Sequence, residues 1–312
     1  MLVALAGGVG AARLLAGLVQ VVDPASITAV VNTGDDLVLH GLHVSPDLDT
    51  VTYTLAGLDN KETGWGVTGE TWTVMTELEA LGGEAWFRLG DRDLATHLFR
   101  TERLERGEPL HQVTAELAAA RGVAVRLLPM SDQPVRTRLT LAEGPDAPRE
   151  VAFQEYFVAL RHAVAVSAVR FDGAEQARPA PGVLEALAEA ELVVVCPSNP
   201  LVSIGPLLAV PGLLEAVQAR RSDVVAVSPL VAGAALKGPA DRLMVELGHE
   251  ASVVGVARLY APWVATLVID EADAHLAGAV EAEGVRCVVA PTVMADPARA
   301  AALARVVLDA RS

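Results

Sequence analysis

The sequence predicts an α/β fold, with a Rossmann-like, doubly wound and mostly parallel sheet and a smaller helical insertion domain. Short apolar runs rich in β-branched residues alternate with helical stretches along the chain. The first run, residues 2–5, leads through a glycine turn into a helix expected at 11–22 and a strand expected at 27–31, which is a β-α-β unit. Polar loops follow nearly every expected strand, at the edge where open α/β sheets bind ligands.

The same alternation continues to the end of the chain. Further strands are expected at residues 192–195, 224–227, 253–256, 266–269 and 286–290, and helices at 182–191, 210–221 and 296–310. Residues 58–121 contain three of the four tryptophans, show helical periodicity and lack clear strands. The segments 123–128, 138–141 and 164–169 are again strand-like. We therefore expect residues 1–57 and 122–312 to form the Rossmann-like domain, interrupted by a helical insertion at 58–121.

Composition excludes several classes of function. The formal net charge of the 312 residues is −15, which opposes the non-specific electrostatics of nucleic-acid binding. No apolar run is long enough to span a membrane, and the first residues lack the basic region of a signal peptide, so we expect a cytoplasmic protein. Cys196 and Cys287 are too few and too far apart for a zinc site or a disulfide framework.

The glycine turn that follows the first strand is a candidate anion site. Gly7, Gly8 and Gly10 lie between a strand and a helix, where a phosphate can approach backbone N–H groups at the helix N-terminus. Arg13 is in the first part of that helix, within reach of such a phosphate. The turn matches neither the dinucleotide nor the P-loop pattern, and the alternative is a tight strand-to-helix connection.

Four carboxylates follow the second strand within fifteen residues. Asp35 and Asp36 form one group and Asp47 and Asp49 the other, and we expect both groups to lie in loops, with a helix beginning near Thr50. Carboxylates this close repel each other unless a cation or hydrogen-bond donors compensate. Oxygen ligands beside a phosphate are typical of a magnesium site. The alternative is that one aspartate caps the helix.

Two later loops carry further candidate ligands. Ser198 and Asn199 lie in a proline-rich loop after the strand at 192–195, and Lys237 lies in a loop after the strand at 224–227. In an acidic protein, a cation at the ligand edge of the sheet is a plausible partner for a diphosphate. The alternative is that both loops are turns closed by a salt bridge.

Seven motifs together resemble the 2-phospho-L-lactate transferase family of coenzyme F-420 biosynthesis. They occur in order over about 240 residues. The matching segments are Gly-Gly-Val-Gly at 7–10, Val-Asn-Thr-Gly-Asp-Asp-Leu at 31–37, Ser-Pro-Asp-Leu-Asp-Thr-Val at 45–51, Leu-Gly-Asp-Arg-Asp-Leu-Ala-Thr-His at 89–97, Leu-Pro-Met-Ser-Asp at 128–132, Pro-Ser-Asn-Pro at 197–200 and Lys-Gly-Pro-Ala at 237–240.

The resemblance implies a reaction and its residues. A ribityl hydroxyl of the deazaflavin Fo would attack the phosphorus that bears a lactyl or enolpyruvyl group in a guanosine diphosphate conjugate, releasing GMP with Mg²⁺ as cofactor. The family's Fo contacts map onto Asp49 and Arg88, with Asp36 and Asp91 as further candidates. The implied catalytic and metal-binding residues are Asp35, Asp47 and Asp49, and the implied diphosphate and nucleotide contacts are Gly7, Gly8, Gly10, Arg13, Ser198, Asn199 and Lys237. The resemblance also implies a homodimer.

Two questions stay open at the level of sequence. The Ala-, Arg- and Gly-rich composition favours an actinobacterial source, in which the family's donor is the phosphoenolpyruvyl conjugate, but no residue distinguishes this donor from the phospholactyl one. The alternative functions are a nucleotide-sugar-binding relative of the same fold without Fo chemistry, and a non-catalytic guanine-nucleotide sensor. The clustered aspartates favour the transferase over both.

Overall fold

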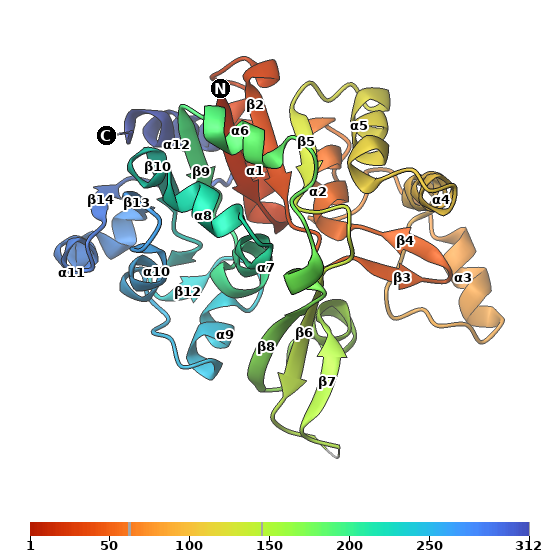
Figure 1. Ribbon diagram of the computed structural model, residues 1–312. Coiled ribbons are helices and arrows are strands. Elements are labelled where there is room, and N and C mark those ends of the chain that lie inside the picture. Colours follow the sequence, from red (N-terminus) through yellow and green to blue (C-terminus); the bar gives the residue numbers. More distant parts are fainter. Residues whose placement is uncertain (62–63, 145, 312) are drawn as a thin grey trace.

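The computed structural model describes residues 1–61, 64–144 and 146–311, and its centre is a seven-stranded parallel sheet (Figure 1). The strand order is β14-β13-β10-β9-β1-β2-β5. The strands are β1 (Leu2–Ala6), β2 (Ile27–Val31), β5 (Arg126–Pro129), β9 (Leu192–Val195), β10 (Val224–Val227), β13 (Thr266–Ile269) and β14 (Arg286–Val289). The chain turns back at β1, which pairs with β2 on one side and β9 on the other. This reversal confirms the Rossmann-like prediction and marks the switch point where such sheets bind ligands.

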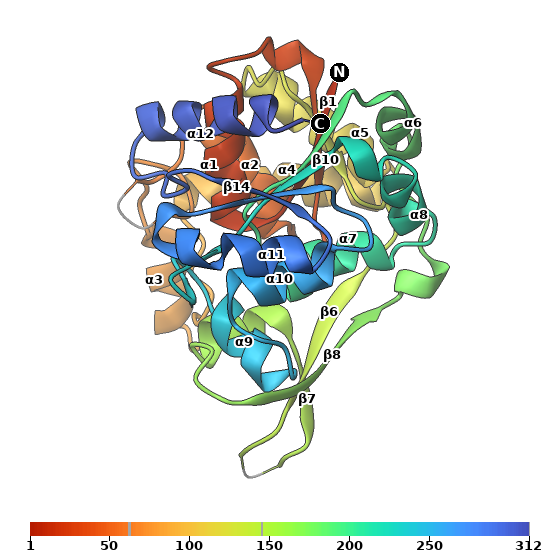
Figure 2. The same ribbon diagram turned by 90° about the vertical axis from the view of Figure 1, so that its left-hand side faces the viewer.

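Alternate residues of β1 belong to two hydrophobic cores, one on each face of the sheet. Leu2, Ala4 and Ala6 pack with the helices α1 (Gly8–Leu18), α2 (Pro46–Leu55), α5 (Leu110–Ala120) and α12 (Pro297–Asp309). Val3 and Leu5 pack with α6 (Val183–Glu189), α7 (Gly205–Ala209), α8 (Leu213–Gln218), α10 (Val253–Tyr260) and α11 (Ala277–Ala282). Figure 2 shows α1 with α12, and α10 beside α11. A strand buried on both faces is uniformly apolar, which explains why these strands are visible in the sequence.

Smaller elements extend from the carboxyl edge of the sheet. The hairpin β3 (Leu37–Leu39) and β4 (Leu42–Val44) packs on α4 (Asp91–Glu105), which in turn contacts α3 (Thr73–Ala80). An antiparallel sheet in the order β7-β6-β8 projects away from the main sheet (Figures 1 and 2). Its strands are β6 (Arg136–Leu141), β7 (Arg149–Ala152) and β8 (Val166–Asp172). A short hairpin, β11 (Leu230–Val231) with β12 (Ala234–Ala235), precedes α9 (Ala240–Glu246).

One expected strand is a helix. Residues 253–256 begin α10, because the Oγ of Ser252 accepts hydrogen bonds from the N–H groups of Val254 and Gly255, both at 3.1 Å. This N-cap starts a helix despite the β-branched composition. The strand-like segments 138–141 and 164–169 are strands, but they belong to the separate antiparallel sheet and not to the main one.

The segment expected as a helical insertion contains α3, α4 and α5. Helix α5 packs against β5 within a core of the main sheet, while α3 and α4 lie further out. The domain limits at 57/58 and 121/122 stay a prediction. Within the described ranges, no helix combines the length and apolar character needed to cross a membrane.

Candidate active site

Three loops meet at the switch point of the sheet, after β1, β2 and β9. The Oγ of Ser198 donates to the carbonyl of Gly7 at 2.7 Å and accepts from its N–H at 3.3 Å, so the β9 loop is fastened to the glycine turn. A Cβ at Gly10 would lie 2.2 Å from the carbonyl oxygen of Pro197. Glycine at position 10 is therefore required by the close approach of two loops, whether or not a phosphate binds there. The carboxamide of Asn199 caps the next turn through the N–H groups of Leu201 and Val202.

Asp47 places its carboxylate at the glycine turn. Its Oδ2 accepts from Nδ2 of Asn32 at 2.9 Å, and the N–H of Gly8 donates to the same carboxylate. Burial is the largest influence on Asp47 and raises its pKa to about 6. The expectation that both acidic groups lie in loops is wrong for the second one, because α2 begins at Pro46 and contains Asp47 and Asp49 in its first turn. Residues that are two positions apart in a helix point to opposite sides. The carboxylates of Asp47 and Asp49 therefore have different neighbours.

Asp35 and Asp36 follow β2 in a loop, as expected. Burial first, and then the charge of Asp47, raise the pKa of Asp35 well above its ordinary value. Asp36 accepts a hydrogen bond from Oγ of Ser45 at 2.8 Å, and burial raises its pKa to about 7. One oxygen of each residue, Oδ1, is buried without a hydrogen-bond partner in the described part of the chain. An unsatisfied buried carboxylate oxygen indicates a site that is completed by a cation or by substrate.

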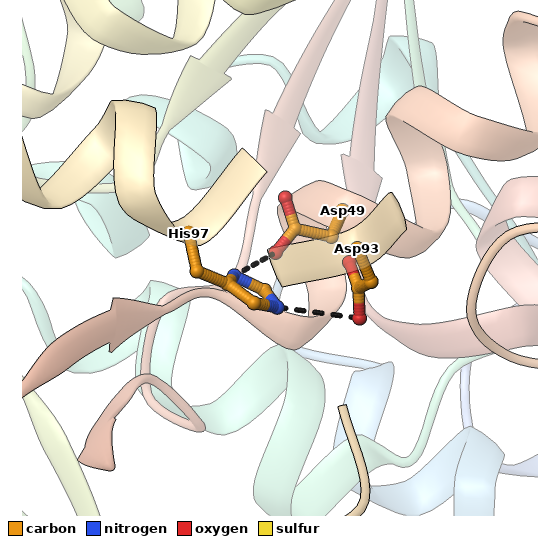
Figure 3. Close-up of side chains that lie close together, drawn as sticks. All are labelled: Asp49, Asp93 and His97. Carbon is orange, nitrogen blue, oxygen red and sulfur yellow. Dashed lines mark ion pairs between the residues drawn. The ribbon is translucent and has the colours of Figure 1, made fainter. Parts of the chain in front are cut away.

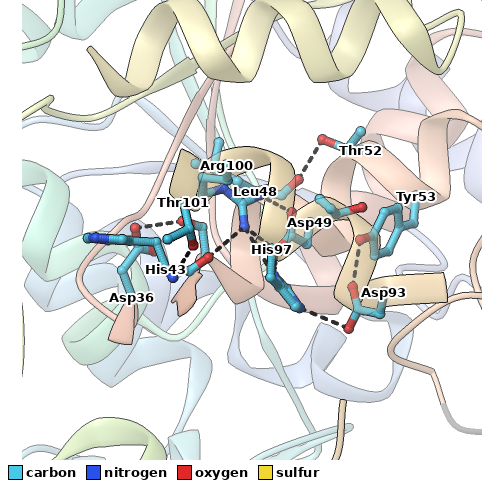
Figure 4. Close-up of polar contacts among 12 residues, drawn as sticks. Asp36, His43, Leu48, Asp49, Thr52, Tyr53, Asp93, His97, Arg100 and Thr101 are labelled. Atoms are coloured by element: carbon cyan, nitrogen blue, oxygen red, sulfur yellow. Dashed lines mark hydrogen bonds and ion pairs between the residues drawn. The ribbon is translucent and has the colours of Figure 1, made fainter. Parts of the chain in front are cut away.

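Asp49 is bound by a buried arginine that the sequence analysis did not single out. Nη1 of Arg100 donates to Oδ2 of Asp49 at 3.1 Å, and Nη2 donates to Oδ1 (Figure 4). The exposed fractions are 2% for Arg100 and 6% for Asp49, so the pair is shielded from solvent. Both oxygens of Asp49 are therefore engaged, in contrast to those of Asp35 and Asp36.

The Asp49–Arg100 pair continues into a buried polar chain along α4 (Figures 3 and 4). Nδ1 of His97 is 3.3 Å from Nη1 of Arg100, and its Nε2 is 3.2 Å from Oδ2 of Asp93. The hydroxyl of Tyr53 donates to Oδ1 of Asp93 at 2.6 Å. Although burial alone would raise it, the pKa of Asp93 is lowered by its contacts with His97, Tyr53 and Arg100.

The spacing of its residues along the sequence is the signal that could have predicted this buried polar network. Asp93, His97 and Arg100 are at positions i, i+4 and i+7, which is one face of a helix. All three residues lie in the fifteen-residue helix α4, and the first two also belong to the motif at residues 89–97. Charged residues at core-facing positions are the signal of a buried polar network.

Asp49, Asp93 and His97 also lie close enough to be considered as metal ligands. In Figure 3, however, the two ring nitrogens of His97 face different carboxylates: Nδ1 is 3.7 Å from Asp49 and Nε2 is 3.2 Å from Asp93. One ligand atom from each of the three residues nevertheless lies within 4.8 Å of the other two, so the spacing by itself would admit a cation. Arg100 already neutralises Asp49, and magnesium prefers oxygen ligands, so this group suits a polar network better than a magnesium site.

The expected cations Arg13 and Lys237 approach each other. Burial and then the charge of Arg13 lower the pKa of Lys237. Arg13 makes a 3.5 Å contact with the carbonyl of Met294, and neither cation forms an ion pair with any described residue. Lys237 also reaches residue Gly64, where a Cβ would lie 2.3 Å from Nζ. Two cations that influence each other's charge and have no ion-pair partner among the described residues indicate an anion-binding surface.

The remaining expected Fo contacts lie near α3. The guanidinium of Arg88 is exposed and stacks over the ring of Trp72, 5.2 Å from its centroid. Asp91 accepts from the hydroxyl of Thr71 and from the N–H groups of Thr73 and Val74, at 2.7, 3.1 and 3.1 Å. These bonds cap the start of α3 and lower the pKa of Asp91. The structure thus gives Asp91 a role in joining α3 to α4.

Comparisons with known proteins identify the family and the fold of the chain. Curated relatives called phosphoenolpyruvate transferase include one from Kitasatospora aureofaciens, 48% identical over 98% of this chain and 96% of its own, and one from Mycolicibacterium smegmatis, 40% identical over 98% and 97%. A crystal structure of a UPF0052 family member from Bacillus halodurans has the same fold, with a TM-score of 0.60 and 17% identity over 98% of both chains. The family description "2-phospho-L-lactate transferase CofD" matches residues 2–303. The chain belongs to this 2-phospho-L-lactate transferase family, the transferases of coenzyme F-420 biosynthesis.

Proposed function

We propose that this chain transfers a phosphoenolpyruvyl group from a guanosine diphosphate conjugate to the ribityl hydroxyl of Fo and releases GMP, with the 2-phospho-L-lactyl conjugate as the other possible donor. The observation that carries the proposal is the pair of buried, mutually repelling carboxylates, Asp35 and Asp47, beside the glycine turn at the switch point. The names of the curated relatives support the enolpyruvyl donor. The cytoplasmic location and the homodimer remain predictions.

The diphosphate would lie between the glycine turn and the two unpaired cations. Arg13 extends from α1 and Lys237 from the loop before α9, so they would approach the phosphates from outside the turn. The guanosine would lie towards the β9 loop at Ser198 and Asn199, by the switch-point rule. Phosphoryl transfer depends chiefly on charge neutralisation and in-line positioning, which such contacts supply.

Asp35 and Asp47 fit a magnesium ion better than Asp49 does. Oδ1 of Asp35 is buried without a partner, and the two carboxylates raise each other's energy in the absence of a cation. Oxygen ligands next to a diphosphate are the environment in which proteins bind Mg²⁺. A bound ion would neutralise charge on the phosphates and orient them.

Asp49 would orient Fo, while the hydroxyl proton would pass to a different carboxylate. Arg100 occupies both oxygens of Asp49, whereas Asp35 and Asp36 each retain an unpartnered acceptor. In the reaction, the hydroxyl oxygen forms the new P–O bond, the bond to the GMP oxygen breaks, and a carboxylate takes the hydroxyl proton. Arg88 would contact the deazaflavin from the α3 side.

Mass spectrometry of reactions with Fo, Mg²⁺ and each conjugate tests the proposal. We expect GMP and an Fo-linked phosphodiester, and the enolpyruvyl product is lighter than the lactyl product by two hydrogens. Asp35→Asn, which removes one metal ligand, is the matched inactive control. Nucleotide binding without any GMP release would instead support a sensor, and binding of nucleotide sugars with no response to Fo would support the non-transferase relative.

A further inference from the structure

A second feature lies beside the carboxylates: a pocket of about 230 Å³ between the β2 loop and the antiparallel sheet. Residues 34–38 form one wall, and the start of β6 with the residues after β7 forms the other. Asp35, the proposed metal ligand, is part of the first wall. The pocket therefore adjoins the position proposed for the reacting phosphate.

The wall contributed by β6 carries positive charge and unsatisfied donors. Arg136 and Arg138 both line the pocket, since alternate residues of a strand share one side. The guanidinium of Arg136 donates to the carbonyl of Val135 at 3.0 Å and forms no ion pair with any residue in the described ranges. Thr137, between them, points to the other side of β6, where a Cβ at Gly34 would lie 2.7 Å from its Oγ1; the residue is 1% exposed, and this Oγ1 has no hydrogen-bond partner among the described residues. Gln154 adds a carboxamide.

An adjoining pocket of about 190 Å³ shares Asp36 and Arg136 but has the opposite character. It adds Glu105 and Asp132 to Asp36, so three carboxylates face a single arginine there. In the first pocket Arg136 and Arg138 accompany Asp35 and Asp36. Arg138 also lies 4.0 Å from Asp172, and a cation on Asp35 would still leave the balance positive. An anionic group is therefore attracted to the first pocket and repelled by the second.

We propose that the Arg136 pocket binds the carboxylate of the group being transferred. This inference rests on the proposed function, because it takes the donor's phosphorus to lie at Asp35. The enolpyruvyl and lactyl groups both end in a carboxylate, and arginine binds carboxylates through paired N–H donors. The pocket distinguishes donors that carry a carboxylate from other guanosine diphosphate conjugates, and Arg136 is its specificity-determining residue.

Arg136→Gln tests the subsite, because the substitution should weaken the binding of ligands that carry a carboxylate and leave the binding of the others unchanged. We expect the KM for the enolpyruvyl conjugate to rise about 10- to 100-fold, because a charge-assisted contact is lost. GDP, which has the diphosphate but no carboxylate, and Fo should bind with unchanged dissociation constants. Phosphoenolpyruvate, added with GMP and Mg²⁺, should bind the wild type and lose affinity for the variant. Arg136→Lys should recover part of the loss.

Arg149→Gln is the matched control, because Arg149 lies at the far end of the same sheet and pairs with Glu155 in solvent. Equal weakening of GDP, weakening of Fo, or an unchanged KM in Arg136→Gln would each overturn the subsite. Phosphoenolpyruvate binding does not require transfer to Fo. A wild type that binds it through Arg136 but makes no Fo-linked product would contradict the proposed function while leaving the subsite intact.

Discussion

The guanidinium of Arg100 holds both carboxylate oxygens of Asp49 in the interior of the protein. The contact joins α4 to the first turn of α2, and therefore links the outer helices to the edge of the main sheet. It also distinguishes Asp49 from Asp35 and Asp47, because no arginine among the described residues is hydrogen-bonded to either of those two carboxylates. The aspartates are close in sequence but differ in what neutralises them.

Removing Arg100 alone should strongly destabilise the protein. Arg100→Leu leaves Asp49 buried and unpaired, which we expect to cost about 3–5 kcal/mol in the free energy of unfolding. Replacing both residues by leucine should recover much of that loss, since neither charge of the pair then remains buried. Urea unfolding of the two single variants and the double variant measures this coupling. Additive losses would show that the pair is not energetically coupled.

Asp35→Asn should stabilise the metal-free protein while reducing its activity. The raised pKa of Asp35 means that its ionised form opposes folding, and this cost develops as the pH rises from the unfolded towards the folded pKa. The variant should therefore have the higher Tm at pH 8 without Mg²⁺, and the Mg²⁺-induced rise in Tm should shrink. We expect turnover to fall at least about 100-fold. Thermal unfolding with and without Mg²⁺ gives the stability result independently of the reaction.

Lys237→Gln should weaken nucleotide binding through charge. We expect the dissociation constant of GDP to rise about tenfold, with a smaller dependence on salt than in the wild type. Lys61→Gln is a useful control, because Lys61 is exposed and already paired with Asp59 at 2.8 Å. Titration of GDP at two ionic strengths checks the prediction. Equal effects of the two substitutions would contradict a local phosphate contact.

Gly10→Ala should disturb the site by steric conflict alone. The added Cβ would meet the carbonyl oxygen of Pro197 at 2.2 Å, so the β9 loop or α1 must shift. We expect a loss of about 1–3 kcal/mol in stability and weaker GDP binding. Gly278→Ala in α11 is the control, because no heavy atom lies within 4 Å of its Cβ and its backbone is helical. It should be neutral or slightly stabilising.

Asp270 should make stability depend on acid pH. Although burial opposes it, hydrogen bonds from the N–H and hydroxyl of Thr292 and the N–H of Ala272 hold the pKa of Asp270 below its ordinary value. Its contribution is complete above the unfolded pKa of about 3.9 and is lost as the pH falls through the folded value. Asp270→Ala should cost about 1–3 kcal/mol at pH 7, and the difference from wild type should narrow as the pH falls below about 4. A constant difference across that range would show that the effect is not electrostatic.

Sequence periodicity predicts the centre of this fold better than its periphery. Strands such as β9 and β10 are buried on both faces, so their composition alone identifies them. Residues 253–256 have the same composition, but the cap at Ser252 and packing against the sheet select a helix. The start of α2 at Pro46 was missed for a related reason, because the acidic residues of its first turn suggest a loop.

Chain proximity predicts a shared site for the aspartates, but it does not predict their partners. Arg100 is fifty-one positions from Asp49, and Arg136 is brought beside Asp36 only by the start of a second sheet. Such contacts depend on how separate elements pack. The motifs therefore predict a site at the edge of the sheet, while the groups that neutralise each carboxylate could be identified only from the three-dimensional structure.

The position of Asp47 has a consequence for the order in which ligands enter. Its carboxylate accepts the N–H of Gly8, and Ser198 accepts that of Gly7, so the turn that would receive a phosphate is already occupied from within. An incoming anion must therefore compete with these side chains for the N–H groups of the turn. Asp47 would help to hold a divalent ion, and its carboxylate would then compete less for these N–H groups. Nucleotide should consequently bind weakly to the metal-free protein and tightly only after the ion.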